Sequence, residues 1–362
     1  MKNFILTLLI VFLFLSFSLS QDIPTVRIGL FKLDREIFLS NVGRVINSYI
    51  QIEAGGNGKV ILKSFENGSI ILNFGKDVLI LTLPVFFYPQ QDKKIGINSS
   101  YYRGIIEINN DGWVINTLNL EDYLLGVVPS EMPYNYPLEA LKAQAVSART
   151  YALSNLGKHK DFDLCSTVHC QVYKGASYEK ERSNMAVKET MGEVITYNGQ
   201  LIKAFYHSSS GGITENSEDV WGGYYPYLRS VKDVEELERD TWEVFLSLDD
   251  IKRKLSNINI NLQEVISIEL DKSSTGRVKN VIIRSNSNDW VFKGTLWREL
   301  FNLPSTLFNI EFSNNGLYLY GRGMGHGVGL SQKGAKILAE KGYNYRDIIK
   351  FYYQGVEIQK WY

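Results

Sequence analysis

The segment from Leu138 to about Leu156 constrains the fold of this chain most strongly. Its apolar residues recur at mostly three- and four-residue steps, as one face of a buried helix requires. Pro137 suits the start of such a helix, and Gly157 supplies an end. The sequence therefore predicts a long, largely buried helix here.

Polar residues on this helix need partners, because an unpaired polar or charged group is costly to bury. They are Gln144, Ser147, Arg149 and Thr150. Two interpretations of Arg149 remain open. It forms an ion pair with Glu139 or another acid, or it lines a cleft beside Glu131.

Glu131 lies in Ser-Glu-Met-Pro, immediately before the predicted helix. Pro129 and Pro133 restrict the backbone on both sides, so we expect Glu131 to be held in a stiff loop. Apolar and aromatic neighbours, Met132, Tyr134 and Tyr136, could raise the pKa of its carboxyl group. A fixed carboxylic acid of this kind is a candidate general acid or base.

Composition indicates an ordinary globular protein of two or three domains: the chain has 362 residues, of which 44% are hydrophobic and 22% are charged. Lys plus Arg and Asp plus Glu both number 39, so no basic field predicts nucleic-acid binding. Residues 1–20 carry an almost unbroken apolar stretch from Phe4 to Leu19. This predicts an exported protein, with residues 1–20 as a signal peptide cleaved after Ser20 or a retained membrane anchor.

The pattern of the remaining chain predicts an α+β fold. Residues 21–117 alternate β-branched runs with turns, including Asn67-Gly68 and Asn110-Asp111-Gly112, and suggest a β-rich meander or small barrel. Residues 118–231 and 311–362 read as one mixed α/β core that contains the long helix. Residues 232–310 read as a smaller accessory α/β lobe.

Two cysteines and two histidines lie within twelve residues: His159, Cys165, His169 and Cys170. Nitrogen and sulfur ligands at this spacing suit tetrahedral zinc, and a structural zinc site is the first interpretation. The alternative is a Cys165–Cys170 disulfide, which an exported protein with two cysteines readily forms. Since His169 and Cys170 are adjacent, His159, Cys165 and Cys170 are the safer predicted ligands.

The segment 204–212 places Tyr206, His207 and Ser208 where a predicted strand ends and glycines follow, a position suited to binding ligand hydroxyls. A Ser208, His207 and Asp219 triad is conceivable, but the GxSxG nucleophile motif is absent from the sequence. A serine hydrolase is therefore disfavoured.

Glycine occupies every second position from Gly321 to Gly329, so another chain segment or backbone can approach closely there. The order of a phosphate-binding loop is absent from this segment. Two interpretations stay open: a tight crossing in the core, or a sugar-binding wall with His326 and Gln332 facing the ligand. Aromatic residues at 221–227 could stack on sugar rings, although core packing explains at least half of them.

Three parts of the sequence together resemble the stage II sporulation protein D family of peptidoglycan lytic transglycosylases and amidase-enhancer homologues. They are LEDYLLGVVPSEMP with KAQAVSARTYAL, AFYHSSSGGITENSEDVWGGYYPYLRSV, and GRGMGHGVGLSQKGA with YRDIIKFYY. The resemblance covers roughly residues 118–231 and 318–357, and implies that the mixed core is the catalytic domain.

This resemblance implies that Glu131 is the catalytic glutamate and Arg149 an arginine needed at the site. Gln144, Gln171, Tyr173, Tyr206, His207, Ser208, His326 and Gln332 are the candidate substrate-binding residues. The implied substrates are peptidoglycan glycan strands already stripped of stem peptides, and an N-acetylmuramoyl-L-alanine amidase is a possible partner. The implied reaction leaves anhydromuramoyl ends.

A single carboxylic acid suffices for that reaction, whereas glycoside hydrolysis ordinarily uses two carboxylates. Two other functions remain open at this point. A non-catalytic wall-binding module would stimulate an amidase through the same cleft. A zinc hydrolase would depend on metal and tolerate a change at Glu131.

Overall fold

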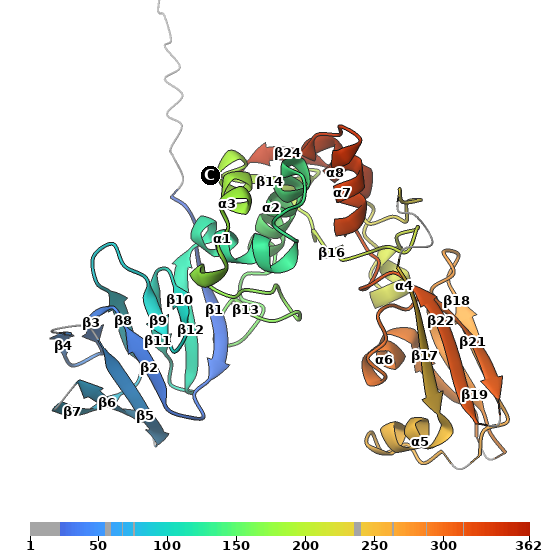
Figure 1. Cartoon of the computed structure of the whole chain (residues 1–362), viewed down its shortest axis with the longest axis horizontal. Coiled ribbons are helices and arrows are strands. Elements are labelled where there is room, and N and C mark those ends of the chain that lie inside the picture. The colour runs from blue at the N-terminus through green and yellow to red at the C-terminus, as the bar shows by residue number, and fades with distance from the viewer. Residues whose placement is uncertain are drawn as a thin grey trace, which may run out of the picture.

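The computed structural model describes residues 22–54, 59–66, 68–74, 77–234, 240–262, 264–286, 288–313 and 315–362. Its architecture is mixed α+β, as predicted. Figure 1 shows a β-rich region and a smaller lobe on opposite sides of a helix-rich core. Each of the three parts has its own cluster of buried apolar residues.

The β-rich region consists of two sheets around one apolar core, with Val45, Leu62 and Phe87 fully buried in it. Its sheet orders are β13-β1-β12-β11-β8-β3-β4 and β10-β9-β2-β5-β6-β7. The strands are β1 (Thr25–Lys32), β2 (Ile37–Ser40), β3 (Val42–Ile46), β4 (Gln51–Glu53), β5 (Val60–Glu66), β6 (Ser69–Phe74), β7 (Asp77–Thr82), β8 (Val85–Pro89), β9 (Ile95–Ile97), β10 (Ser100–Tyr102), β11 (Ile105–Ile108), β12 (Trp113–Asn119) and β13 (Leu164–Cys165).

Turn residues explain how neighbouring strands in this region connect. The predicted turn at 110–112 joins β11 to β12. Gly112 has a φ of 77°, and its N–H donates to the carbonyl oxygen of Asn109 at 3.0 Å. Asn67 of the other predicted turn lies outside the described residues. Strand β1 also packs into the helical core through Val26 and Ile28, so the two parts share a boundary strand.

The helical core surrounds α2 (Leu138–Leu153), which confirms the predicted buried helix. Twelve of its residues are buried, because α1 (Leu120–Glu131), α3 (Glu181–Glu189), α7 (Gln332–Glu340), α8 (Tyr345–Tyr352) and β14 (Glu193–Tyr197) all pack on it. Smaller elements complete the core: η1 (Ala176–Tyr178), β15 (Gln200–Leu201), β16 (Tyr206–His207), α4 (Ser217–Trp221), β23 (Leu330–Ser331) and β24 (Glu357–Lys360).

The lobe combines two three-stranded sheets with two helices around the fully buried Trp297. Its elements are β17 (Thr241–Ser247), α5 (Leu248–Ser256), β18 (Ser267–Lys272), β19 (Val278–Arg284), β20 (Trp290–Lys293), α6 (Gly294–Leu300), β21 (Phe308–Ser313) and β22 (Gly316–Arg322). Strand β22 pairs with both β17 and β21, and Leu317 and Leu319 are buried in the lobe. Residues 311–322, assigned to the core in the predicted division, therefore pack with the lobe.

The glycine-rich segment crosses from the lobe back into the core. A Cβ atom at Gly327 would lie 2.4 Å from Cζ of Arg277, and one at Gly329 would lie 2.2 Å from the carbonyl oxygen of Phe205. Both glycines also have positive φ angles. Of the two interpretations of this segment, the geometry fits the tight crossing.

None of the helices in the described part of the chain combines the length and the apolar composition that a membrane span needs. The predicted signal peptide or anchor at residues 1–20 lies outside the described residues.

Candidate active site

Glu131 is the last residue of helix α1, whereas the sequence had predicted a loop. The helix begins at Asn119, whose side-chain Oδ1 accepts a hydrogen bond from the N–H of Asp122. It accommodates Pro129 inside its last turn, and Ser130 Oγ donates to the carbonyl of Gly126. The prolines therefore restrain a helix end, and Glu131 is rigidly placed.

The carboxyl group of Glu131 is largely enclosed by the protein. Its Oε1 accepts a hydrogen bond from the backbone N–H of Val172 at 2.5 Å, and the Tyr206 hydroxyl donates to it. Burial raises the pKa of Glu131 above its ordinary value, and these two hydrogen bonds oppose the rise. Among the described residues, no Lys, Arg or His forms an ion pair with Glu131.

Tyrosines and one glutamine form the surroundings of this carboxyl group. The Gln171 amide donates to the Tyr206 hydroxyl at 3.0 Å and accepts from the Tyr123 hydroxyl at 3.3 Å. Tyr151 packs edge-on against Tyr206, with ring centroids 6.4 Å apart. Burial raises the pKa of Tyr123 and Tyr206 well above the ordinary value, so both remain neutral donors.

Two of these tyrosines, Tyr123 and Tyr151, were not predicted from the sequence, which suggested Tyr134 and Tyr136 in their place. Tyr134 is 52% exposed and does not enclose the carboxyl group. A helical reading of residues 120–131 would have placed Tyr123, Val127 and Glu131 on one face at four-residue steps. The overlooked signal was therefore the first helix itself.

The assignment of Arg149 to the catalytic site is wrong in this geometry. Arg149 is fully buried, and its Nε and Nη2 donate to the two carboxylate oxygens of Glu121, each at 2.8 Å. Its remaining donors reach the carbonyls of Glu193 and Val187. Glu121 and Glu131 are ten residues apart on α1, about 15 Å along the helix. Arg149 is thus a structural ion-pair partner, and the acid is Glu121 instead of Glu139.

Tyr173 is also a core residue and does not line a binding surface. It is 4% exposed, its hydroxyl donates to Asn116 Oδ1 at 2.8 Å, and its ring packs on Tyr123 at 5.0 Å. A Cβ at Gly126 would lie 2.6 Å from the Tyr173 ring, so the residue holds α1 close. The prediction that Tyr173 binds substrate is corrected accordingly. Gln171, fully buried, acts by positioning Tyr206.

His207 and Ser208 do not form a hydrolase triad with Asp219. His207 Nδ1 contacts the Val328 carbonyl at 3.2 Å, and Asp219 pairs with Lys279 at 3.1 Å. Burial lowers the pKa of His207 to about 3, so its ring is neutral. The Ser208 carbonyl accepts the N–H of Lys333 at the start of α7. These three residues thus have other partners in the structure: a backbone carbonyl for His207, Lys279 for Asp219 and the N–H of Lys333 for Ser208.

Three further residues were predicted to face substrate: Gln144, Gln332 and His326. Gln332 Nε2 donates to Gln144 Oε1 at 3.3 Å, and both side chains are buried between α2 and α7. His326 is half-buried, and its ring lies 5.0 Å from that of Trp221, which is 47% exposed. Of the three residues, His326 borders an exposed aromatic surface, and the two glutamines join helices.

The predicted metal ligands converge: one ligand atom from each of His159, Cys165, His169 and Cys170 lies within 4.8 Å of the others. Three separations between donor atoms are 3.3 Å for His159 Nε2 to Cys170 Sγ, 3.6 Å for Cys165 Sγ to His169 Nδ1, and 3.5 Å for Cys170 Sγ to His169 Nδ1. Zinc–ligand bonds of 2.0–2.3 Å in a tetrahedron give ligand separations of about 3.3–3.8 Å. The three separations lie within this range, and the residue types are those that zinc prefers.

Both cysteines are free thiols in the structure, so the alternative disulfide is not formed there. The reservation about adjacent His169 and Cys170 is also corrected, because both side chains reach the common centre. This loop continues directly into Gln171 and Val172, the residues that hold Tyr206 and Glu131. The metal-ligand cluster therefore borders the segment that shapes the active site.

Comparison with known proteins follows this division of the molecule. The family model described as stage II sporulation protein matches residues 109–197, which include α1, α2 and the ligand cluster. A second model, described as a domain of unknown function (DUF8618), matches residues 227–329, mainly the lobe. Two separate family models thus match the part with the site and the part with the lobe.

Curated relatives extend the match over most of the chain. The stage II sporulation protein D of Bacillus subtilis is 34% identical over 269 residues, which cover 68% of this chain and 76% of that protein. An uncharacterised protein of Brachyspira hyodysenteriae is 37% identical, and the match covers 71% of this chain and 72% of that protein. The B. subtilis amidase enhancer is 33% identical, with 65% of this chain and 40% of that protein covered. The chain belongs to the stage II sporulation protein D family and is related to cell-wall and sporulation proteins.

Proposed function

We propose that the protein is a peptidoglycan lytic transglycosylase in which Glu131 is the general acid and base. The observation that carries the proposal is the state of its carboxyl group. Burial raises its pKa, no cation pairs with it in the described chain, and no other carboxylate contributes to the shift. A glutamic acid with these properties can donate a proton near neutral pH.

In the proposed reaction, Glu131 protonates the glycosidic oxygen between the muramoyl and glucosaminyl sugars. The resulting carboxylate then accepts the proton of the muramoyl 6-hydroxyl, whose oxygen bonds to the anomeric carbon of the same sugar. The internal hydroxyl takes the place of water and benefits from proximity. The Val172 N–H and the Tyr206 hydroxyl stabilise the transient carboxylate.

Zinc is proposed as a structural ion held by His159, Cys165, His169 and Cys170. Four protein ligands close a tetrahedral shell and leave no position for a catalytic water. The metal would stiffen the loop that leads to Gln171 and Val172. A zinc hydrolase is disfavoured for the same reason.

We further propose that the chain acts outside the cytosol, because the apolar run at residues 4–19 fits an export signal or anchor and its proposed substrate lies there. An N-acetylmuramoyl-L-alanine amidase is the proposed partner. The relative named amidase enhancer also supports a second candidate function, a wall-binding module that stimulates an amidase without cutting glycan.

Product analysis separates these functions. Purified protein is incubated with glycan strands stripped of stem peptides, and the new ends are identified by mass spectrometry. A transglycosylase gives anhydromuramoyl ends, and Glu131→Gln gives none. Intact bare strands with the wild-type protein, together with faster turnover by an amidase in a parallel assay on peptide-bearing strands, would establish the binding module instead.

A further inference from the structure

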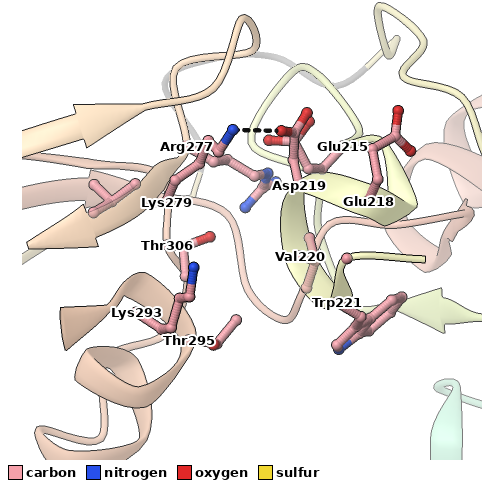
Figure 2. Close-up of a pocket in the computed structure, with 12 residues that line it drawn as sticks. Glu215, Glu218, Asp219, Val220, Trp221, Arg277, Lys279, Lys293, Thr295 and Thr306 are labelled. Atoms are coloured by element: carbon pink, nitrogen blue, oxygen red, sulfur yellow. Dashed lines mark ion pairs between the residues drawn. The ribbon is translucent and has the colours of Figure 1, made fainter. Parts of the chain in front are cut away.

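A cavity of about 470 Å³ lies between the lobe and helix α4 of the core (Figure 2). The core contributes acidic and aromatic side chains from α4, and the lobe contributes cations and hydroxyls from β19, β20, the start of α6 and neighbouring loops. Among the residues that line it are Asp219, Trp221, Lys279, Lys293, Thr295 and Thr306. Neither the family descriptions nor the proposed reaction assigns a role to this cavity.

Charges around the cavity leave cations to spare. Glu218 is neutralised by Arg229, which lies outside the cavity lining. Glu215 is buried and accepts hydrogen bonds from Ser273 and Thr275 at 2.5 and 2.6 Å. Lys293 is exposed and has no acidic partner among the described residues.

Lys279 is the second available cation. It meets Asp219 across the cavity at 3.1 Å, as Figure 2 shows, but its side chain remains 42% exposed. The exposed part of the Lys279 side chain leaves this cation open to a ligand anion, which would share it with Asp219. Thr295 adds an exposed hydroxyl donor on the same side of the cavity as Lys293.

The cavity also connects to the proposed active site through aromatic packing. Trp221 borders it, and the indole lies 4.6 Å from the ring of Phe205 and 5.0 Å from that of His326. Phe205 immediately precedes Tyr206, whose hydroxyl bonds to Glu131. An exposed indole beside a polar cavity suits a sugar ring that carries a charged substituent.

We propose that this cavity is a binding site for a carboxylate of the cell-wall polymer, held by Lys293 and Lys279, with Trp221 stacking on the adjoining sugar. The inference rests on the proposed function, because it takes the ligand to be the same polymer. Two sources share the chemistry. In bare strands the carboxylate is the free lactyl group of muramic acid, and in peptide-bearing strands it belongs to the stem peptide.

Calorimetric titration of the full chain in a Glu131→Gln background tests the site without ligand cleavage. The probes are a bare muramic-acid-containing oligosaccharide, the same oligosaccharide with its carboxyl groups converted to amides, and a peptide-bearing oligosaccharide. Lys293→Gln is compared with Lys252→Gln, a lobe lysine on α5 that does not line the cavity. Lys279→Gln serves as the second cavity variant.

We expect Lys293→Gln to weaken binding of one carboxylate-bearing probe by about three- to tenfold, and Lys252→Gln to leave it unchanged. Amidation should weaken binding by the parent protein similarly and remove the difference between the variants. The probe that responds identifies the source of the carboxylate. Equal affinities of the parent and both cavity variants for every probe, or no binding by the parent, would overturn the proposal. Wild-type product formation is measured separately, so a failure here is distinguishable from a failure of the proposed reaction.

Discussion

Helix α1 carries two enclosed glutamates in opposite environments. Glu121, in its first turn, meets the guanidinium of Arg149 through both oxygens and also accepts from the Gly192 N–H and the Tyr362 hydroxyl. Glu131, at the other end, meets one backbone N–H and tyrosines, and burial raises its pKa. The comparison shows how one helix can supply a structural anion at one end and a proton donor at the other.

From this difference between the two glutamates, we expect the largest effect on product formation from a substitution of Glu131. Replacement by Gln preserves shape but removes the acidic carboxyl proton, so we expect anhydromuramoyl product to fall by about 10³-fold or more. Initial rates on bare glycan strands measure it. Circular dichroism should show the same folded protein, and a variant rate within threefold of wild type would remove Glu131 from the reaction.

Glu121→Gln should instead damage stability. It leaves the fully buried Arg149 without its counter-charge, and breaking a buried pair costs about 3–5 kcal/mol. Denaturant unfolding of the purified, folded variant measures its free energy of unfolding. The matched control is Glu340→Gln, which breaks the exposed Lys336 pair on α7 and should cost under about 0.5 kcal/mol. Equal costs at both positions would refute the structural role of Arg149.

Loss of the metal should lower the catalytic rate, which depends on Glu131 at the end of α1, and should leave the Glu121–Arg149 ion pair at its start intact. Cys165→Ser removes one proposed ligand, and a displacement of Val172 by about 1 Å can lower the rate by up to about 100-fold. Elemental analysis should find one zinc per wild-type chain and less in the variant. The opposite result, full activity in metal-free protein, would separate the loop from catalysis.

Thiol titration gives an independent check of the state of the two cysteines, because a disulfide would leave no reactive thiols.

Tyr206→Phe should give a smaller loss, about tenfold, equivalent to one hydrogen bond to a charged group. The Tyr206 hydrogen bond lowers the pKa of Glu131, so its removal should raise that pKa further. Because the acid form starts the reaction, activity falls as pH rises through this pKa. The alkaline limb of the pH–rate profile should therefore move to higher pH in the variant, and a shift to lower pH would contradict the assignment.

The smallest expected effect is the change in melting temperature that a substitution of Glu131 causes. Its folded-state pKa is raised, so folding favours the protonated form, and that contribution is present at low pH and lost as pH rises through the folded pKa. Glu131→Gln should therefore melt slightly higher than wild type at pH 7, with the difference shrinking toward pH 4. Thermal melts across this range measure it, and a lower melting temperature at pH 7 would count against burial of an ionised carboxylate.

Periodicity in the sequence was sufficient to predict helix α2, the mixed architecture and the grouping of metal-ligand residues. These depend on local spacing: apolar steps along α2, and four ligand types within twelve residues. Glu131 was also found from its local context, although its helix was not, because Pro129 and Pro133 were interpreted as stiffening a loop. In the structure Pro129 lies within the last turn of α1.

Long-range partners could not be predicted from the sequence. Arg149 pairs with Glu121, 28 positions away, and two of its other contacts come from β14 and α3. Tyr173 reaches Asn116 on β12, and Gln332 reaches Gln144 across 188 positions. A single sequence shows that these polar groups need partners, but the tertiary fold selects which partner each one meets.

Isotope labelling of the product tests the central claim most directly. Bare glycan strands are cleaved in water enriched in oxygen-18, and the new muramoyl ends are analysed by mass spectrometry. A single Glu131 acting with the internal 6-hydroxyl predicts ends that are lighter than hydrolysis products by one water and carry no label. Ends that contain one labelled oxygen would show that water attacks the anomeric carbon, and would contradict the account.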